Sequence, residues 1–290
     1  MSRTRLAAAV ALGLIGGLVG AVSTEIPASA AGPIVFTNAG AITIPDSGPA
    51  TPYPSTIQVS GLTTAITDVN VTLTGYSHTC PFDVAALLVA PTGQQTLLMA
   101  DLGPGLGCPD ATSANLTFDD AAATAVPYPP TTGTWKPTDG EPAGDNNFPA
   151  PAPAGGAHPT SLAAFNGLAG NGTWSLYVID ENGGDTGTIS GGWNLSITTA
   201  PDTTPPDTVI TKAPPKKSAK RHVKIYFSST EPGSTFRCSL DGATPVPCTS
   251  PAKYRRLKVG RHKFSVYAID AAGNADATPA RVRFRVKHKR

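Results

Sequence analysis

Two alternating segments, each with a tryptophan, constrain the fold of this 290-residue chain more than any other feature. The segments TWSLYVI (residues 173–179) and WNLSI (residues 193–197) place apolar side chains at every second position. A period of two is typical of half-buried β-strands, and it puts Trp174 and Trp193 on apolar faces. We predict that residues 165–197 form a β-hairpin whose strands share one core, with an acidic, glycine-rich loop between them.

The composition favours an all-β protein. The chain contains 30 Gly and 29 Pro, and only 14% of its residues are charged. Short alternating runs bounded by Gly, Pro, Asn and Asp recur, and no long amphipathic helix pattern is present. We therefore expect packed sheets throughout.

The first 31 residues have the layout of a secretory signal peptide. Arg3 and Arg5 precede an apolar run over residues 6–22, and the small residues ASA end at Ala30. This order of a basic, an apolar and a small-residue segment predicts export and cleavage near Ala31 or Gly32. An uncleaved membrane anchor is the alternative, because the apolar run approaches the length that spans a bilayer. After cleavage no second hydrophobic span remains, and we expect a monomer.

The four cysteines predict two disulfides rather than a metal or redox site, because the chain looks exported and has no C-x-x-C pair. We expect Cys80 to pair with Cys108, and Cys238 with Cys248. Each of these pairs lies inside one expected folding unit, whereas the other pairings would tie two domains together across a linker.

A domain boundary is expected at the Pro- and Thr-rich stretch of residues 198–214. We assign residues 32–200 to the first domain, 201–208 to a linker and 209–290 to the second domain. Residues 32–200 contain one basic residue, Lys136, and thirteen acids, a formal charge of −12. Residues 201–290 contain ten Lys and nine Arg against six acids, a formal charge of +13. The near-neutral total of +2 therefore conceals two oppositely charged domains.

The first domain resembles the P domain (P/Homo B) that follows subtilisin-like catalytic domains in kexin-type proprotein convertases and in bacterial secreted proteases. The likeness covers about residues 33–200. Four upstream blocks carry it, together with the stretch 165–197: residues 41–78 (AITIPDSG…TGYSH), FDVAALLVAPTG (82–93), LLMADLG (97–103) and LTFDDAA (116–122). The resemblance implies a jelly-roll-like β-sandwich that supports or accompanies a protease in another chain. It does not by itself imply proteolysis.

The second domain resembles the immunoglobulin-like repeats of exported bacterial proteins, over about residues 205–287. STEPGSTFRCSLDG (229–242) and LKVGRHKFSVYAIDAAGN (257–274) carry this likeness, which implies a smaller sandwich used as a spacer or adhesion module. Alternation along its strands predicts a core of Ile225, Phe227, Phe236, Phe264, Val266, Ala268, Val282, Phe284 and Val286. Ten residues of separation are too few to bridge opposite sheets, so Cys238 and Cys248 should staple a local hairpin.

Residues 126–159 are rich in Pro and Gly and have almost no apolar periodicity. We expect a long excursion off the sandwich that buries little surface and is partly ordered by Trp135 and Phe148. An adaptable surface loop and a binding loop are both consistent with this composition.

Nothing in the sequence marks an active site. The chain has no G-x-S-x-G elbow and no subtilisin-like Asp, His and Ser blocks. His78 follows Ser77 and is able to approach Asp83, which leaves a triad open, but we favour a histidine held by a hydrogen bond for structural reasons. We predict that the chain is not an enzyme.

Two acidic clusters are candidates for a calcium site, since Ca²⁺ takes six to eight oxygen ligands from carboxylates and loop carbonyls. The first combines Asp101 with Asp119 and Asp120, which match recurring acids of the P-domain blocks. The second combines Asp180 with Asp185 in the loop after the first Trp segment. Ala85 stands where relatives carry a further acid, and turn formation is the alternative role for all five aspartates.

The basic residues of the second domain predict a positive stripe on one sheet face. A positive stripe attracts polyanions such as acidic wall polymers, phospholipid headgroups or extracellular DNA, without sequence-specific nucleic-acid recognition. The −12 domain of the same chain and plain solubility are the alternatives. The residues of the stripe are Arg255, Arg256, Lys258, Arg261, Lys263, Arg281, Arg283 and Arg285.

Together these features predict a secreted, non-catalytic binding or accessory protein that resides in the medium or on the cell wall. The P-domain-like module recognises or stabilises an unidentified partner, and the basic module acts as a spacer or adhesion module. The alternative is an accessory component of a subtilisin/kexin-type endopeptidase system.

Overall fold

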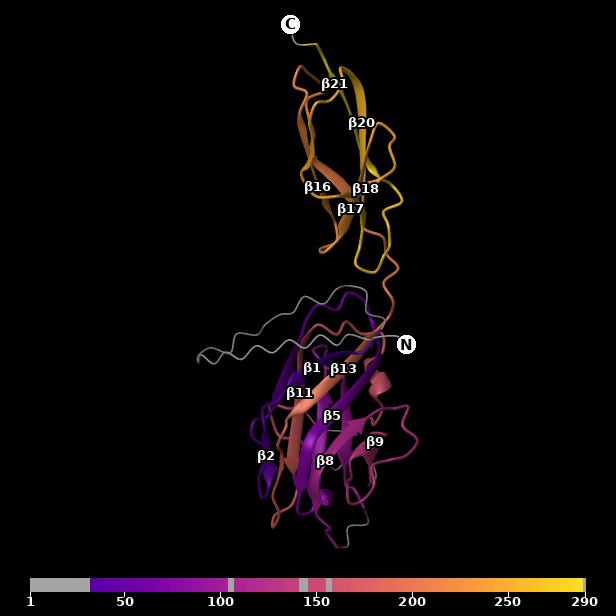
Figure 1. Cartoon of the computed structure of the whole chain (residues 1–290). Helices are drawn as coiled ribbons and strands as arrows, with labels where there is room; N and C mark the ends of the chain where they lie inside the picture. Colours follow the sequence, from indigo (N-terminus) through magenta and orange to yellow (C-terminus); the bar gives the residue numbers. More distant parts are fainter. Residues whose placement is uncertain (1–31, 104–106, 141–145, 155–157, 289–290) are drawn as a thin grey trace, which may run out of the picture.

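The computed structural model describes residues 32–103, 107–140, 146–154 and 158–288. Its regular elements in these residues are β-strands and two short 3₁₀ helices, so the all-β prediction is confirmed. Figure 1 shows two lobes joined by one extended passage of the chain. No helix in the described residues is long and apolar enough to cross a membrane. The predicted signal peptide, residues 1–31, lies outside the described residues.

The first lobe is a sandwich of a seven-stranded and a six-stranded sheet. The seven-stranded sheet has the order β1-β13-β5-β12-β2, with β8 on the other edge of β5 and β9 beside β8. Its strands are β1 (Ile34–Asn38), β2 (Ile42–Ile44), β5 (Ile66–His78), β8 (Ala111–Phe118), β9 (Gly133–Trp135), β12 (Gly187–Ile189) and β13 (Trp193–Thr199).

The six-stranded sheet has the order β10-β7-β6-β11-β3, and β4 also pairs with β11. Its strands are β3 (Gly48–Pro49), β4 (Ser55–Val59), β6 (Val84–Val89), β7 (Gln95–Ala100), β10 (Thr138–Asp139) and β11 (Gly172–Asp180). The 3₁₀ helices are η1 (Pro81–Asp83), between β5 and β6, and η2 (Leu162–Phe165), before β11.

The core between these sheets contains both predicted tryptophans. Trp174 and Trp193 are fully buried in one apolar cluster with Tyr76, Phe118 and Phe165. The Trp174 indole N–H donates to the Gly170 carbonyl at 2.9 Å, so its polar atom is satisfied inside the core. The prediction that the two Trp-containing strands share one core is therefore confirmed.

The predicted hairpin is wrong. β11 belongs to the six-stranded sheet and β13 to the seven-stranded sheet, so the chain crosses between the layers after Asp180. β11 pairs with β3, β4 and β6, while β13 pairs with β1 and β5. Alternation reveals which face of a strand is buried, and two strands facing each other across a sandwich give the same pattern as two neighbours.

The described part of the Pro-rich excursion contributes to an outer layer, which corrects the expectation that the excursion buries little surface. Phe148 is 3% exposed and packs with Ala152 and Tyr53 on the outer face of β6, β7 and β11. The hydroxyl of Tyr53 donates to the Pro149 carbonyl at 2.9 Å. This cover explains why every residue of β6 is buried, whereas an open sheet face would leave every second one exposed.

The second lobe is a smaller sandwich of a three-stranded sheet, β14-β16-β19, and a five-stranded sheet, β15-β21-β20-β17-β18. The nine predicted core residues are confirmed, with Phe236 and Val282 half-buried against the other seven. The strands are β14 (Thr208–Lys212), β15 (Lys217–Ser218), β16 (Val223–Ser229), β17 (Thr235–Leu240), β18 (Val246–Cys248), β19 (Ala252–Tyr254), β20 (Gly260–Ile269) and β21 (Ala280–Val286).

Both predicted disulfides are present, Cys80–Cys108 and Cys238–Cys248, and the described residues contain no free cysteine. Cys238 lies on β17 and Cys248 on the adjacent β18, so the second bond staples a local hairpin as expected. Disulfides persist in oxidising compartments, which supports an exported protein.

Candidate functional site

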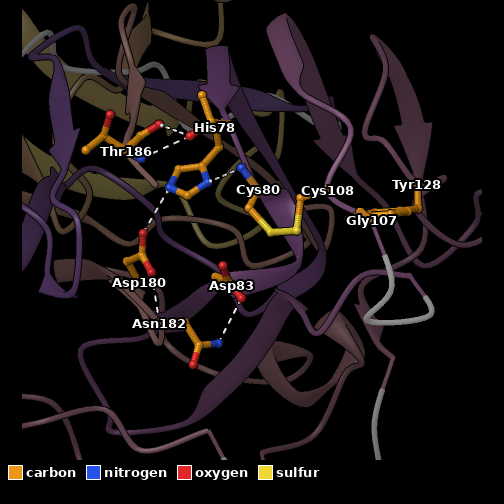
Figure 2. Close-up of a disulfide and its surroundings, with 10 residues drawn as sticks. His78, Cys80, Asp83, Gly107, Cys108, Tyr128, Asp180, Asn182 and Thr186 are labelled. Carbon is orange, nitrogen blue, oxygen red and sulfur yellow. Dashed lines mark hydrogen bonds and ion pairs between the residues drawn. A yellow bond between two sulfur atoms is a disulfide. The ribbon is translucent and has the colours of Figure 1, made fainter. Parts of the chain in front are cut away.

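A buried hydrogen bond between a histidine and an aspartate links the two sheets of the first sandwich at one end. His78 closes β5 and Asp180 closes β11, and both side chains are fully buried. The His78 Nε2 atom lies 3.1 Å from Asp180 Oδ2, and the backbone N–H of Cys80 donates to His78 Nδ1 at 3.1 Å (Figure 2). Because Nδ1 accepts a hydrogen bond, it carries no proton, so Nε2 is the donor to Asp180.

The loop around this pair is held by side chains of the crossing segment. Asn182 donates through Nδ2 to Asp83 Oδ1 at 2.8 Å, and its backbone N–H donates to Asp180 Oδ1 at 3.1 Å (Figure 2). Burial raises the pKa of Asp180, while the Asn182 and His78 hydrogen bonds oppose that shift. Burial, with the nearby Asp180 and Asp83 charges, likewise raises the pKa of Tyr76.

This geometry decides between the two expectations for His78. Both ring nitrogens are engaged, one by a backbone N–H and one by a carboxylate, so neither is free to accept a proton from a serine hydroxyl. His78 is held by hydrogen bonds, as the favoured interpretation expected, and the acid that it contacts is Asp180 rather than Asp83.

The first predicted calcium cluster does not assemble. Asp120 accepts hydrogen bonds from Ser161 Oγ and the N–H groups of Leu162 and Ala163, and so caps η2. Asp119 accepts the Ala121 N–H at 2.7 Å in a turn. Asp101 is buried at the end of β7. The turn-forming alternative therefore describes Asp119 and Asp120.

The second predicted cluster is also divided. Asp180 bonds His78, while Asp185 lies in a different group, with ligand atoms of Cys80, Asp83 and Asp185 within 4.8 Å of one another. The Cys80 sulfur belongs to a disulfide, so this group offers two carboxylates. Calcium needs six to eight oxygens, and the paired aspartates predicted from the sequence do not supply them together.

A further acidic group was not anticipated from the sequence. Asp202, Glu231 and Asp270 place carboxylate oxygens within 4.8 Å of one another where the chain enters the second sandwich. Burial and the charges of Asp202 and Asp270 raise the pKa of Glu231. The three acids are far apart in the sequence and each stands alone among neutral residues, so no local signal marks them.

The predicted basic stripe is divided between two surfaces. Five of its residues are exposed on the outer face of β20 and β21: Arg261, Lys263, Arg281, Arg283 and Arg285. We call these five the β20–β21 ladder, because Arg261 lies opposite Arg285 and Lys263 opposite Arg283. Lys258 is exposed in the preceding loop, and Arg255 and Arg256 lie in the loop that follows β19 of the other sheet.

Arg255 and Arg256 follow β19 and line an open groove of about 780 Å³. We call this the β16–β19 groove. Its other lining residues come from the segment before β16, from the start of β16 and from β19, and only Arg255 and Arg256 were singled out from the sequence. The complete lining is Arg221, His222, Val223, Lys224, Lys253, Tyr254, Arg255 and Arg256.

Within the part of the chain that the structure describes, no Lys or Arg side chain forms an ion pair with an acid. In the described residues, the contacts at 4 Å or less between a basic and an acidic side chain are His78–Asp180 and His262–Asp241, and neither involves a Lys or Arg. The basic second sandwich therefore exposes its charge to the surroundings, and the described structure shows no pairing with the acidic first sandwich.

Comparisons with known proteins do not identify the chain. No family model matches it, and no curated protein does. One similar structure is the extracellular domain of a protein described as a one-component system of B. thetaiotaomicron, at 15% identity and a TM-score of 0.22, over 33% of this chain and 18% of that one. Another is a β-1,2-glucanase from Parabacteroides distasonis, at 14% identity and a TM-score of 0.22, over 82% of this chain and 31% of that one. The chain spans less than a third of either structure, and at these scores neither bears on its function.

Proposed function

We propose that this chain is an exported, non-catalytic binding protein with two modules. The first sandwich, P-domain-like in its sequence blocks, recognises or stabilises a partner protein. The second sandwich tethers the molecule to an anionic polymer outside the cell, such as one of the cell wall.

The unpaired basic charge of the second sandwich carries this proposal. Lys224 on β16 lies directly opposite Lys253 on β19, and like charges at directly opposed positions destabilise a sheet. No carboxylate of the described chain relieves this repulsion. A polyanion supplies the missing countercharge, so binding stabilises what the isolated fold leaves strained.

The engagement of both His78 nitrogens supports a non-catalytic first module, since the residue nearest to a triad in the sequence has no free base. The hydrogen bonds of Asp83, Asp120 and Asp180 likewise serve the fold. The two disulfides support export.

The tether is tested by retention of the purified protein on immobilised anionic polymers over a range of salt concentrations. We expect binding whose logarithm falls linearly with the logarithm of salt concentration. Absence of binding to every polyanion at low salt would contradict the tether. A serine-reactive probe tests the non-catalytic assignment, and labelling of a single serine would overturn it in favour of a role in proteolysis.

A further inference from the structure

The β16–β19 groove differs from the β20–β21 ladder in shape and in composition. The ladder is a sheet face, whereas the groove is concave. Six of its eight lining residues are basic types and none is acidic. Concave sites bury more of a ligand than flat ones, so the groove is the better candidate for a defined anion site.

Two features of the groove position its cations before any ligand arrives. Arg221 Nε donates to the Leu257 carbonyl at 2.6 Å, and the Leu257 N–H donates to the Arg221 carbonyl at 3.0 Å. This reciprocal contact fixes the segment before β16 against the loop after β19. Arg256, in that loop, has a φ of 56°, a left-handed conformation that is uncommon for a residue other than glycine.

Lys224 and Lys253 lie directly opposite each other on β16 and β19, and both are exposed. Their mutual repulsion is relieved by an anion that both contact. Arg255 and Arg256 add guanidinium groups, which bind phosphate oxygens in a bidentate fork. The set therefore suits a ligand that carries several phosphates along a chain.

The single aromatic residue in the lining argues against nucleic acid. Tyr254 is half-buried, and its ring packs edge-on against Phe264 with centroids 6.0 Å apart. Proteins that bind single-stranded nucleic acids stack successive bases on several aromatic side chains. A phosphodiester polymer without bases fits this lining better.

We propose that the β16–β19 groove binds a wall polymer of repeating polyol phosphates, with Lys224, Lys253, Arg255 and Arg256 contacting its phosphodiester groups. This inference rests on the proposed tether function and assigns that function to one site.

The test compares two full-length variants that each lose four charges. The groove variant is K224Q/K253Q/R255Q/R256Q, and the matched control is the ladder variant R261Q/K263Q/R283Q/R285Q. The probes are synthetic poly(glycerol phosphate), single-stranded DNA of equal phosphate number, and polygalacturonate of equal charge. Affinity is measured by isothermal calorimetry at several salt concentrations, and far-UV circular dichroism checks folding.

We expect the groove variant to lose about 100-fold in affinity for poly(glycerol phosphate), because charge-assisted contacts are strong and four are removed. The slope of the logarithm of its binding constant against the logarithm of salt concentration should become less steep by about 4. The ladder variant should lose less than about 3-fold in affinity. If the groove variant does not fold, the pair K224Q/K253Q, with both side chains exposed on strands, gives the same comparison. The charge-conserving K224R/K253R should retain binding.

Equal losses in the groove and ladder variants would overturn the groove assignment and leave the tether function standing. Tighter binding of DNA or polygalacturonate than of poly(glycerol phosphate) would overturn the polyol-phosphate assignment. Failure of the unmodified protein to bind any probe would overturn the tether function itself.

Discussion

Each sandwich contains a buried histidine next to an aspartate, but the two histidines are held in different ways. His78 of the first sandwich accepts one hydrogen bond and donates one, which fixes a neutral ring between Cys80 N–H and Asp180. His262 of the second sandwich faces two acceptors, Asp241 Oδ2 at 2.7 Å and the Lys258 carbonyl at 2.8 Å. Both contacts are hydrogen bonds only when both ring nitrogens carry a proton, so this environment favours the protonated ring.

This difference matches the way each sandwich treats charge. Both sandwiches satisfy buried acids internally, as Asp83 and Asp180 show in the first and Asp270 and Asp276 show in the second. The second differs in that it keeps many Lys and Arg side chains exposed, and none of them forms an ion pair within the described residues. We infer that these surface cations of the second module are available for binding.

The largest expected difference between the two modules follows from truncating a core side chain in one of them. Trp193→Ala should destabilise the first sandwich by about 3–5 kcal/mol, because it leaves a cavity in the core. Differential scanning calorimetry should show the loss in one transition only. The matched variant Phe264→Ala should lower the other transition, and a shift of both transitions by either variant would contradict independent folding.

Removing the acid from the first histidine should have the next largest effect. Asp180→Ala leaves a buried His78 N–H without its acceptor, which should cost about 1–3 kcal/mol. Asp180→Asn keeps an acceptor oxygen and should cost less. Chemical denaturation at neutral pH measures both, and equal stability of the alanine variant and the unmodified protein would contradict the structural role.

The second histidine should make stability depend on pH. Burial alone lowers the pKa of His262, but the hydrogen bonds to Lys258 and Asp241 and the Asp241 charge outweigh it, so the pKa is raised. A raised pKa gives stability that is complete below the unfolded value of about 6.5 and is lost as the pH rises through the folded value.

The melting temperature of the second sandwich should therefore be lower at a pH above the folded pKa of His262 than at a pH below about 6.5. The free energy of unfolding should fall by about 0.5–1.5 kcal/mol, the contribution of one hydrogen bond. The melting temperature between pH 5.5 and 9 is the measurement. His262→Gln should remove the step, while the exposed His222→Gln should keep it. An unchanged step in His262→Gln would assign the titration to another group.

The smallest expected effect is a gain in stability. Lys263→Thr removes one of two cations that oppose each other on β20 and β21, and should stabilise the second sandwich by about 0.2–1 kcal/mol. Lys287 lies beyond the end of β21, so Lys287→Thr serves as the control. Thermal melting at low salt measures the difference, and a destabilised Lys263→Thr would show that the ladder does not strain the sheet.

The sequence predicted the faces of the strands better than their partners. Alternation placed Trp174 and Trp193 in one core, yet it did not distinguish neighbours in a sheet from strands that face each other across a sandwich. Phe148 was expected to order its segment partly, but the extent of burial around it was underestimated because a proline-rich segment buries isolated side chains without any period. Domain separation was sufficient to pair the cysteines, because each bond is local.

The candidate sites depend on contacts between distant residues, and so were largely hidden. His78 and Asp180 are 102 residues apart, and only the ends of two strands in different sheets bring them together. The β16–β19 groove combines residues near 221 with residues near 255 through strand pairing. Arg255 and Arg256 alone stood out in the sequence, because two adjacent arginines are visible without a fold.

The first sandwich begins and ends at neighbouring points, since Ile34 on β1 pairs with Ile197 on β13. A protein engineer can treat such a unit as a cassette: joined through this one corner, it fits into a surface loop of an unrelated host without stretching that host's backbone.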